Sequence, residues 1–325
     1  MLLDRGKFAE AAASLQEGLS LARRGTDQER ICLCLGLLSG IARFGGDYQQ
    51  ANQYCQEGLA LARQVANQSE ANSLLSPLLM DLGTTFCEQG EYEQAEQYLQ
   101  EGLARTRQTG NRALLCSQLV NCSQVAYYKG DHARAEAYTM EALEVARQIG
   151  YLYALATATG NLGAMVAERG QYDLAEVYQQ ESLQPGRQLE NPVTICSTLG
   201  NLGDLALKQG HTEQAGEYLQ EASVLAHQVG RPVLLCEVLE LWGEVCLRQQ
   251  RLDQALAAFE EIKEVAAGEL PANKAAGWYG LARVVLAQGR RDEAHTHGQE
   301  SRRLFTSIGN HRAAEVEKWL RETFS

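Results

Sequence analysis

A short stretch of sequence recurs along this chain at intervals of about 40 residues. Residues 161–175 read NLGAMVAERGQYDLA, and residues 201–215 and 121–135 repeat the pattern with substitutions. One position near its middle, the marker position, is glycine in every copy but one: Gly6, Gly46, Gly90, Gly130, Gly170, Gly210, Gln250 and Gly289. A fixed period of this size is typical of a protein that stacks one supersecondary unit. We therefore expect a solenoid.

Two other positions keep small side chains in every copy. Five residues after the marker the residue is alanine: Ala11, Ala51, Ala95, Ala135, Ala175, Ala215, Ala255 and Ala294. Seven residues before it the residue is small: Ser39, Gly83, Ser123, Gly163, Gly203, Gly243 and Ala282. Small residues at fixed positions allow two helices to approach closely, because a larger side chain would push their axes apart. The pattern predicts an all-α chain of helical hairpins.

Each hairpin is expected to consist of a helix A that ends at the marker and a helix B that follows it. The marker glycine suits a tight helix exit with positive φ. The next residue, as in Asp47, Glu91 or Asp131, suits the start of helix B. Helix B then ends at a glycine: Gly25, Gly110, Gly150, Gly230 or Gly309. Four extra residues around positions 67–77 predict a longer loop or helix end there.

We expect residues 1–325 to form a single solenoid domain, since no linker rich in Ser, Gly or Pro interrupts the repeats. Residues 1–26 are a partial first repeat, 27–309 contain about seven hairpins, and 310–325 form a C-terminal capping helix. Val316, Trp319 and Leu320 are the residues expected to cover the last hairpin. The incomplete first repeat suggests a segment of a longer protein, or an N-terminus covered by something else.

Composition narrows the classes of partner and compartment. The net charge of −12 and the pI near 5.1 disfavour a nucleic acid or an anionic membrane surface as a partner. No run approaches the ~18 apolar residues of a membrane span, and the N-terminus lacks a signal-peptide pattern. Cysteine recurs fourteen residues before the marker, at Cys32, Cys116, Cys196 and Cys236. This indicates a buried core position in a reducing, cytoplasmic setting.

The sequence offers no convincing catalytic or metal-binding motif. His295, His297 and His311 are weak metal candidates, because alternate positions on a helix point apart. Cys32 and Cys34 are too closely spaced for a zinc or redox pair. No phosphate-binding loop, nucleophile elbow or His-Glu-x-x-His pattern occurs. We expect no enzyme, no metal and no cofactor.

The recurring small positions carry a family resemblance. Small residue, marker glycine, alanine and second small residue follow at fixed spacing in Gly83, Gly90, Ala95 and Gly102, and again in Gly163, Gly170, Ala175 and Ser182. This pattern resembles the tetratricopeptide repeat. It departs from the commonest form in its period of 40 rather than 34 residues, in the missing closing proline, and in leucine where tryptophan is usual: Leu79, Leu119, Leu199 and Leu239.

The longer repeat resembles the C-terminal sensor regions of MalT-like bacterial regulators, which belong to the STAND class of signalling NTPases. It is also similar to repeats of kinesin light chains and of bacterial peptide-sensing regulators. The resemblance implies a right-handed superhelix of antiparallel hairpins. In such a superhelix, helix A lines a concave groove that binds a peptide, a protein or an effector.

Polar residues at one position of helix A are the candidate binding residues. Asn121, Asn161 and Asn201 lie two residues before the small position, with Asp81 in the same place one repeat earlier. An amide donates and accepts at once, so these side chains can pair with an extended peptide backbone. Neighbouring residues would supply specificity: Gln124, Asp204, Glu244, Tyr127, Tyr128, Lys208 and Arg248. The alternative is that the asparagines bond within or between hairpins and fix the repeat geometry.

Two functions remain open. In the first, the chain is the ligand-sensing arm of a larger cytosolic signalling regulator, with an effector domain fused upstream of residue 1. In the second, it is a freestanding adaptor that holds a protein complex together. The upstream reading frame would distinguish them.

Overall fold

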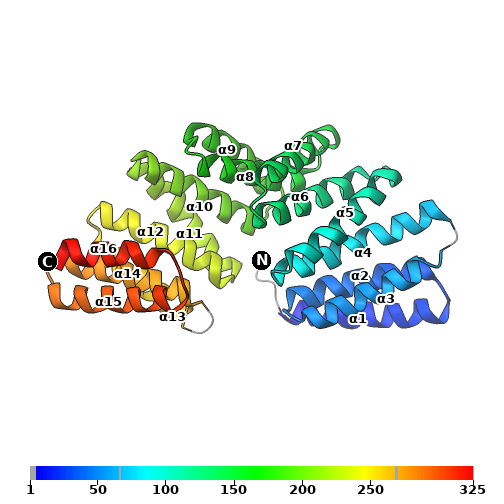
Figure 1. Ribbon diagram of the computed structural model, residues 1–325, viewed down its shortest axis with the longest axis horizontal. Coiled ribbons are helices and arrows are strands. Elements are labelled where there is room, and N and C mark those ends of the chain that lie inside the picture. Colours follow the sequence, from blue (N-terminus) through cyan, green and yellow to red (C-terminus); the bar gives the residue numbers. More distant parts are fainter. Residues whose placement is uncertain (1–4, 66, 268–269, 325) are drawn as a thin grey trace. The chain divides into compact units, whose positions relative to one another are not determined.

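The computed structural model describes residues 5–65, 67–267 and 270–324. Those ranges contain sixteen α-helices and no strand, which confirms the all-α prediction (Figure 1). The helices are α1 (Arg5–Arg24), α2 (Gln28–Phe44), α3 (Tyr48–Ala62), α4 (Gln68–Glu88), α5 (Tyr92–Thr109), α6 (Arg112–Tyr128), α7 (His132–Ile149), α8 (Leu152–Glu168), α9 (Tyr172–Gln188), α10 (Pro192–Gln209), α11 (Thr212–Val229), α12 (Pro232–Arg248), α13 (Leu252–Val265), α14 (Pro271–Ala287), α15 (Arg291–Ser307) and α16 (Arg312–Phe324). Within the described ranges, no helix is long and apolar enough to cross a membrane.

The marker position ends helix A with a left-handed residue, as predicted. The described marker glycines have φ between 74° and 83°: Gly46, Gly90, Gly130, Gly170, Gly210 and Gly289. Gln250, which replaces glycine once, adopts the same conformation with φ of 60°. This backbone conformation costs an L-residue other than glycine about 1–2 kcal/mol. The repeat geometry therefore imposes the turn even where the sequence lacks its usual residue.

The B helices α3, α5 and α7 begin directly after Asp47, Glu91 and Asp131, as predicted. Asp47 accepts a hydrogen bond from the backbone N–H of Gln50 at 3.0 Å, and Asp131 accepts one from Arg134 at 3.1 Å. Glu91 is the N-cap of α5, but its side chain makes no capping bond. The longer glutamate side chain is a poorer N-cap than aspartate.

A left-handed glycine ends four of the eight described B helices, namely α5, α7, α11 and α15. Gly110, Gly150, Gly230 and Gly309 have φ between 65° and 71°. At the end of α1 the left-handed residue is Thr26, with φ of 57°, rather than the glycine before it. The four extra residues near position 67 lengthen helix A itself, since α4 has 21 residues where α2 and α6 have 17. Pro77 lies inside this longer helix.

The two helices of a hairpin pack closely at the small position. A Cβ atom added to Gly83 would lie 2.6 Å from Leu99 Cγ, and one added to Gly243 would lie 2.5 Å from Phe259 Cζ. Carbon atoms cannot approach this closely without displacement. The recurring small residues therefore leave room for a large side chain of helix B.

The recurring alanine is fully buried in each hairpin, with 0% exposure at Ala51, Ala95, Ala135, Ala175, Ala215, Ala255 and Ala294. Ala11 of α1 is exposed, and no described helix precedes α1. The contrast shows that helix A of the same hairpin provides this burial.

The recurring cysteines lie in the core, as predicted. Cys32, Cys116 and Cys196 donate from Sγ to the carbonyl oxygens of Gly58, Ala142 and Ala222 at 3.6, 3.8 and 3.4 Å. Burial raises the pKa of the Cys32 and Cys196 thiols to about 11. These thiols are therefore small core groups that also satisfy a helix carbonyl.

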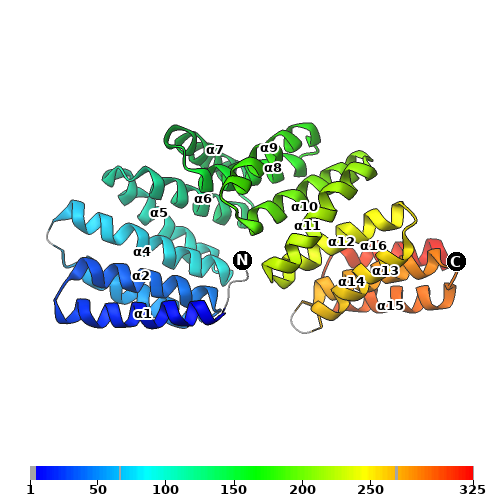
Figure 2. The same ribbon diagram turned by 180° about the vertical axis from the view of Figure 1, so that it is seen from behind.

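The described residues fall into two compact units, here called the N-terminal unit (up to residue 165) and the C-terminal unit (from residue 166). In the N-terminal unit, α2 packs on α4 and α4 on α6, and α2 and α4 run side by side in Figure 2. In the C-terminal unit, α10 packs on α12 and α12 on α14. The A helices α2, α4 and α6 therefore form one continuous layer, and α10, α12 and α14 form another.

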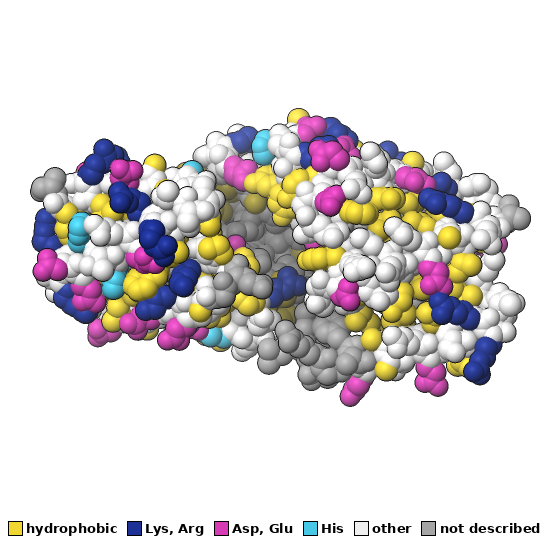
Figure 3. Space-filling view, turned by 60° about the horizontal axis from the view of Figure 1, so that its bottom comes forward, with side chains coloured by type: hydrophobic (Ala, Val, Ile, Leu, Met, Phe, Trp, Pro, Cys, Tyr) yellow, Lys and Arg dark blue, Asp and Glu magenta, His cyan; other side chains and the backbone are white. Residues whose placement is uncertain are grey.

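Consecutive B helices are linked by an ion pair that recurs with the repeat. Arg107 bonds Glu141 at 2.9 Å in the N-terminal unit, and Arg187 bonds Glu221 at 3.0 Å in the C-terminal unit. Each pair joins residues 34 positions apart. Because its side chains are about half exposed, each pair contributes at most about 1 kcal/mol to the stability of the fold. On the face shown in Figure 3, acidic and basic side chains are interspersed.

The last helix, α16, covers the hairpin of α14 and α15. A Cβ atom on Gly298 would lie 2.7 Å from Leu320 and 2.8 Å from Trp319. Val316 is fully buried, and the buried Ser301 Oγ donates to the Ala275 carbonyl at 2.7 Å. The apolar face of α16 thus occupies the space that the small residue on α15 leaves.

Candidate functional site

A cavity of about 280 Å³ opens between α6 and α8 in the N-terminal unit. This α6–α8 cavity is lined by Val120, Ser123, Gln124, Tyr127, Tyr128, Thr157, Asn161, Ala164 and Met165. At about 30 Å³ for each water molecule, its volume matches roughly nine waters, which leaves room for a large amino-acid side chain. Its wall is mainly apolar and its rim carries amides and hydroxyls, as is usual for a ligand pocket.

The 40-residue repeat explains how these side chains come together. On α6, Val120, Gln124 and Tyr127 follow at helical spacing, which places them on one face of the helix. On α8, Thr157, Asn161 and Ala164 do the same. Ala164 occupies the repeat position of Gln124, forty residues on. The shorter alanine side chain leaves the space that becomes the cavity.

An aromatic cluster builds one wall of the cavity. Tyr128 of α6 stacks on Tyr92 of α5 with ring centroids 5.3 Å apart, and Tyr127 meets Tyr128 edge to face at 6.0 Å. His132 of α7 packs against the other side of Tyr127 at 5.3 Å. Tyr128 is still 50% exposed. These rings present a large, restrained surface for an apolar side chain.

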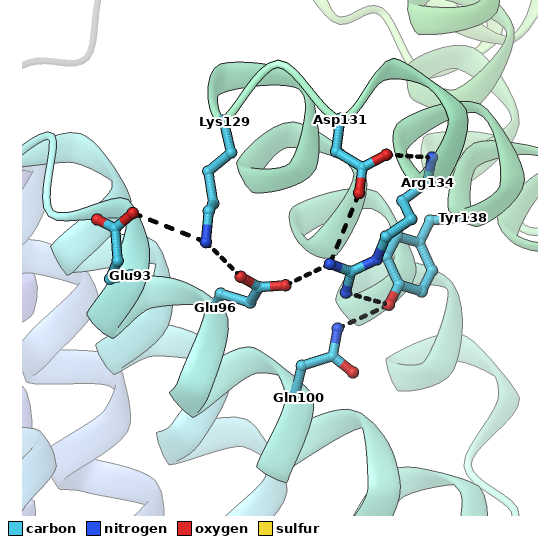
Figure 4. Close-up of polar contacts among 7 residues, drawn as sticks. All are labelled: Glu93, Glu96, Gln100, Lys129, Asp131, Arg134 and Tyr138. Carbon is cyan, nitrogen blue, oxygen red and sulfur yellow. Dashed lines mark hydrogen bonds and ion pairs between the residues drawn. The ribbon is translucent and has the colours of Figure 1, made fainter.

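An ion-pair network holds the turn beside Tyr128 in place (Figure 4). Glu96 of α5 bonds Lys129 Nζ at 2.6 Å and Arg134 Nη1 at 2.7 Å, so it joins α5 to both sides of the turn between α6 and α7. The hydrogen bond from Lys129, supported by Arg134, lowers the pKa of Glu96. Arg134 also donates to the Tyr138 hydroxyl at 3.2 Å. The network therefore fixes the position of the tyrosine wall.

The structure distinguishes among the candidate asparagines. Asn121 of α6 donates from Nδ2 to the Thr84 hydroxyl of α4 at 3.1 Å, which links two A helices. Asn161 of α8 lines the α6–α8 cavity, and its side-chain amide makes no hydrogen bond to the described part of the chain. Gln124 of α6 also lines the cavity, and its side-chain amide likewise makes no hydrogen bond to the described residues. Two unpaired amides thus face one pocket, whereas Asn121 takes part in packing.

Asp81 occupies the equivalent position on α4. Burial raises the pKa of its carboxyl to about 7, and the charge of Arg43 opposes the shift. Its Oδ2 lies against Gly36 of α2, where an added Cβ would be 3.5 Å away. Arg43 itself pairs with Glu88. Asp81 is therefore a carboxyl that changes protonation near neutral pH.

The remaining candidates lie in the C-terminal unit, where the charged ones bond each other. Asn201 is exposed on α10. Asp204 and Lys208 form an ion pair at 2.7 Å along the same helix. On α12, Glu244 bonds Arg248 at 2.8 Å. These four charged residues have protein partners, unlike the cavity amides.

Sequence patterns did not single out every residue of the α6–α8 cavity. Val120, Thr157 and Met165 line it but were not predicted. The sequence feature that could have indicated the cavity is Ala164, which has a short side chain at the repeat position that Gln124 occupies forty residues earlier. Arg283 was also missed: it bonds Glu244 at 2.7 Å.

Two family models match the sequence. The MalT-like tetratricopeptide-repeat region matches residues 1–159, and the tetratricopeptide repeat matches residues 153–226 and 234–307. No curated protein matches the sequence.

Solved structures with the same fold include several repeat proteins. A STAND signal-transduction ATPase with a tetratricopeptide-repeat sensor, from Pyrococcus horikoshii, matches with a TM-score of 0.68 and 16% identity. The match covers 90% of this chain and 46% of that one. A Rap protein complexed with competence and sporulation factor matches with a TM-score of 0.65 and 13% identity over 98% and 95% of the two chains. NprR in complex with its cognate peptide NprX matches with a TM-score of 0.57 and 16% identity over 89% and 85%.

Identities this low show a common fold and no more. The family models and the fold nevertheless agree with the 40-residue period, the left-handed marker and the close-packed small positions. The chain belongs to the tetratricopeptide-repeat family, and its residues 1–159 match the MalT-like form of the repeat.

Proposed function

We propose that this protein is a non-catalytic module that binds a peptide, or an extended segment of a protein, along its A helices. The α6–α8 cavity would receive one apolar side chain of that ligand. The observation that carries the proposal is the pairing of a tyrosine-walled pocket with two unbonded amides, Gln124 and Asn161. An amide offers a donor and an acceptor, which is the combination that a peptide backbone requires.

The related folds support this proposal. The NprR structure holds its cognate peptide, and the Rap structure holds competence and sporulation factor. A pocket for one side chain beside amides that bond the backbone is a common way to recognise extended peptides. The cavity is mainly apolar, so we expect a leucine, methionine or aromatic residue at the anchored position of the ligand.

The finer proposal is that the module is the sensor arm of a larger cytoplasmic regulator. The STAND ATPase supports it, because this chain matches about half of that protein, which carries a tetratricopeptide-repeat sensor. The free cysteines of the described chain fit a reducing compartment. The alternative is a freestanding adaptor. A nucleotide-binding or DNA-binding module fused in frame upstream would favour the sensor arm.

Peptide selection tests the binding proposal directly. Random peptides displayed on phage would be enriched on the immobilised full chain, and the affinity of an enriched peptide measured by calorimetry. Replacing both Gln124 and Asn161 with alanine should remove two hydrogen bonds of about 1 kcal/mol each. The affinity should then fall roughly thirtyfold.

The matched control is Gln56→Ala. Gln56 is exposed on the B helix α3, and its side chain makes no hydrogen bond to the described residues. Its replacement should leave the peptide affinity unchanged. If the double variant binds the selected peptides as tightly as the unchanged protein does, the α6–α8 cavity is not the binding site.

A further inference from the structure

A second cavity, of about 290 Å³, lies among α12, α13, α14 and α16 in the C-terminal unit. This C-terminal chamber is lined by Glu240, Leu241, Glu244, Phe259, Ala276, Tyr279, Gly280, Arg283, Arg312 and Glu315. The volume corresponds to roughly ten waters at about 30 Å³ each. It therefore matches a molecule the size of a free amino acid.

Four helices line the chamber. Ala276 and Gly280 line it from α14 and Phe259 lines it from α13, and the Phe259 ring fills the space in which a Cβ atom on Gly280 would lie. Arg312, at the start of α16, reaches α12, where it bonds Glu240 at 2.7 Å. This ion pair therefore joins the α16 and α12 walls of the chamber.

The charges of the chamber are nearly balanced. Glu244 bonds both Arg283 at 2.7 Å and Arg248 at 2.8 Å, while Arg312 bonds Glu240 and lies 3.9 Å from Glu315. The lining therefore holds three carboxylates and two guanidinium groups, and Arg248, which bonds Glu244 from outside the lining, supplies the third positive charge. Arg283 has five N–H donors and uses one of them in this bond. Glu315 has only its distant ion pair within the chamber, so both signs of charge keep unused bonding capacity.

Tyr279 is a buried polar group that lines the chamber without a partner. Its side chain is 8% exposed, and its ring packs against Trp319 and beneath Arg283. Its hydroxyl makes no hydrogen bond to the described part of the chain. Burial raises the pKa of this phenol, so it stays neutral and can donate or accept. Solvent still reaches this hydroxyl, so it is free to bond water or a ligand.

We propose that the C-terminal chamber binds a small zwitterion of the α-amino-acid class with an apolar side chain. Its carboxylate would use the free donors of Arg283 and Arg312, its ammonium group would face Glu315, and Tyr279 would bond either group. A guest with one net charge would leave an uncompensated charge in a partly buried site, which is costly. A zwitterion keeps the balance, and Leu241 and Phe259 offer contact to its side chain.

Calorimetric titration of the full chain with three related probes tests the charge requirement. L-Leucine carries both charges, leucinamide only the ammonium group and N-acetylleucine only the carboxylate. We expect leucine to bind and each of the other two to bind at least tenfold more weakly. Equal binding of leucinamide would make this a cation site, and equal binding of N-acetylleucine an anion site. Either result overturns the proposal, as does the absence of binding by leucine, methionine and phenylalanine at millimolar concentration.

The Tyr279→Phe variant locates the binding. It removes a hydroxyl that has no protein partner, so stability should be unchanged while leucine affinity falls about three- to tenfold. Tyr172→Phe in α9 is the matched control, since that hydroxyl also has no hydrogen bond to the described residues. Unchanged affinity in Tyr279→Phe would contradict the proposal. The site is separate from the α6–α8 cavity, so failure here leaves the peptide-binding proposal standing.

Discussion

Asn121 and Asn161 occupy the same position of successive repeats. We nevertheless expect their replacement by alanine to change the stability of the protein in opposite directions. Asn121 donates to Thr84 at 3.1 Å, so Asn121→Ala loses one neutral hydrogen bond of about 1 kcal/mol. Asn161 lines the α6–α8 cavity and has no such bond in the described chain, so Asn161→Ala loses none. In both cases alanine is the better helix former, by about 0.5 kcal/mol.

The net effects follow from these terms. Asn121→Ala should lower the free energy of unfolding by about 0.5 kcal/mol, and Asn161→Ala should raise it by about 0.5 kcal/mol. Thr84 still donates to the Met80 carbonyl at 2.8 Å, so no buried hydroxyl is left without a partner in the first variant. The difference of about 1 kcal/mol between two chemically identical substitutions isolates the hydrogen bond.

Urea unfolding followed by circular dichroism measures both values, provided that the slope of the transition is unchanged. A double-mutant cycle with Thr84→Ala adds a check, because helix propensity cancels in the cycle. The coupling energy between Asn121 and Thr84 should be about 1 kcal/mol. Equal stabilities of the two single variants, or a coupling energy near zero, would refute the division of these asparagines into packing and ligand-facing residues.

Three further predictions concern the solenoid itself. Gln250→Gly should raise the free energy of unfolding by about 1 kcal/mol, because Gln250 holds a left-handed φ of 60°; chemical denaturation measures it. The pKa of Glu96 is lowered in the folded protein, so its ion pairs stabilise the fold fully above the ordinary glutamate pKa and are lost as pH falls through the lower folded pKa. Glu96→Gln should therefore make the free energy of unfolding depend less on pH in this acidic range. Removal of residues 310–325 should expose Ala275 and promote aggregation, detectable by light scattering.

The regular part of the fold was predictable from sequence because each repeat faces the same packing problem. The marker glycines, the buried alanines and the core cysteines recur at fixed spacing, and each has the same physical role in every copy. Even Gln250, which is not glycine, could be assigned to the marker position from the 40-residue period. Glu91 also lies at the predicted helix start, although its longer side chain makes no capping hydrogen bond.

The candidate site was only partly predictable, because it depends on differences between repeats. Position alone made Asn121 and Asn161 equivalent, and only the contact with Thr84 separates them. The α6–α8 cavity arises where Ala164 replaces a longer side chain. The C-terminal chamber depends on Arg312 reaching a residue 72 positions earlier in the chain. Contacts over such distances leave no periodic signal.

The methionines offer the most direct test that a peptide occupies the α6–α8 cavity. The chain has four, of which Met165 lines the cavity and Met140 is 57% exposed on the B helix α7. Methyl-labelled protein would be titrated with a phage-selected peptide and followed by NMR. We predict that the Met165 methyl resonance shifts in proportion to binding while that of Met140 stays in place. Saturating peptide that leaves Met165 unmoved would contradict the assignment of this cavity as the binding site.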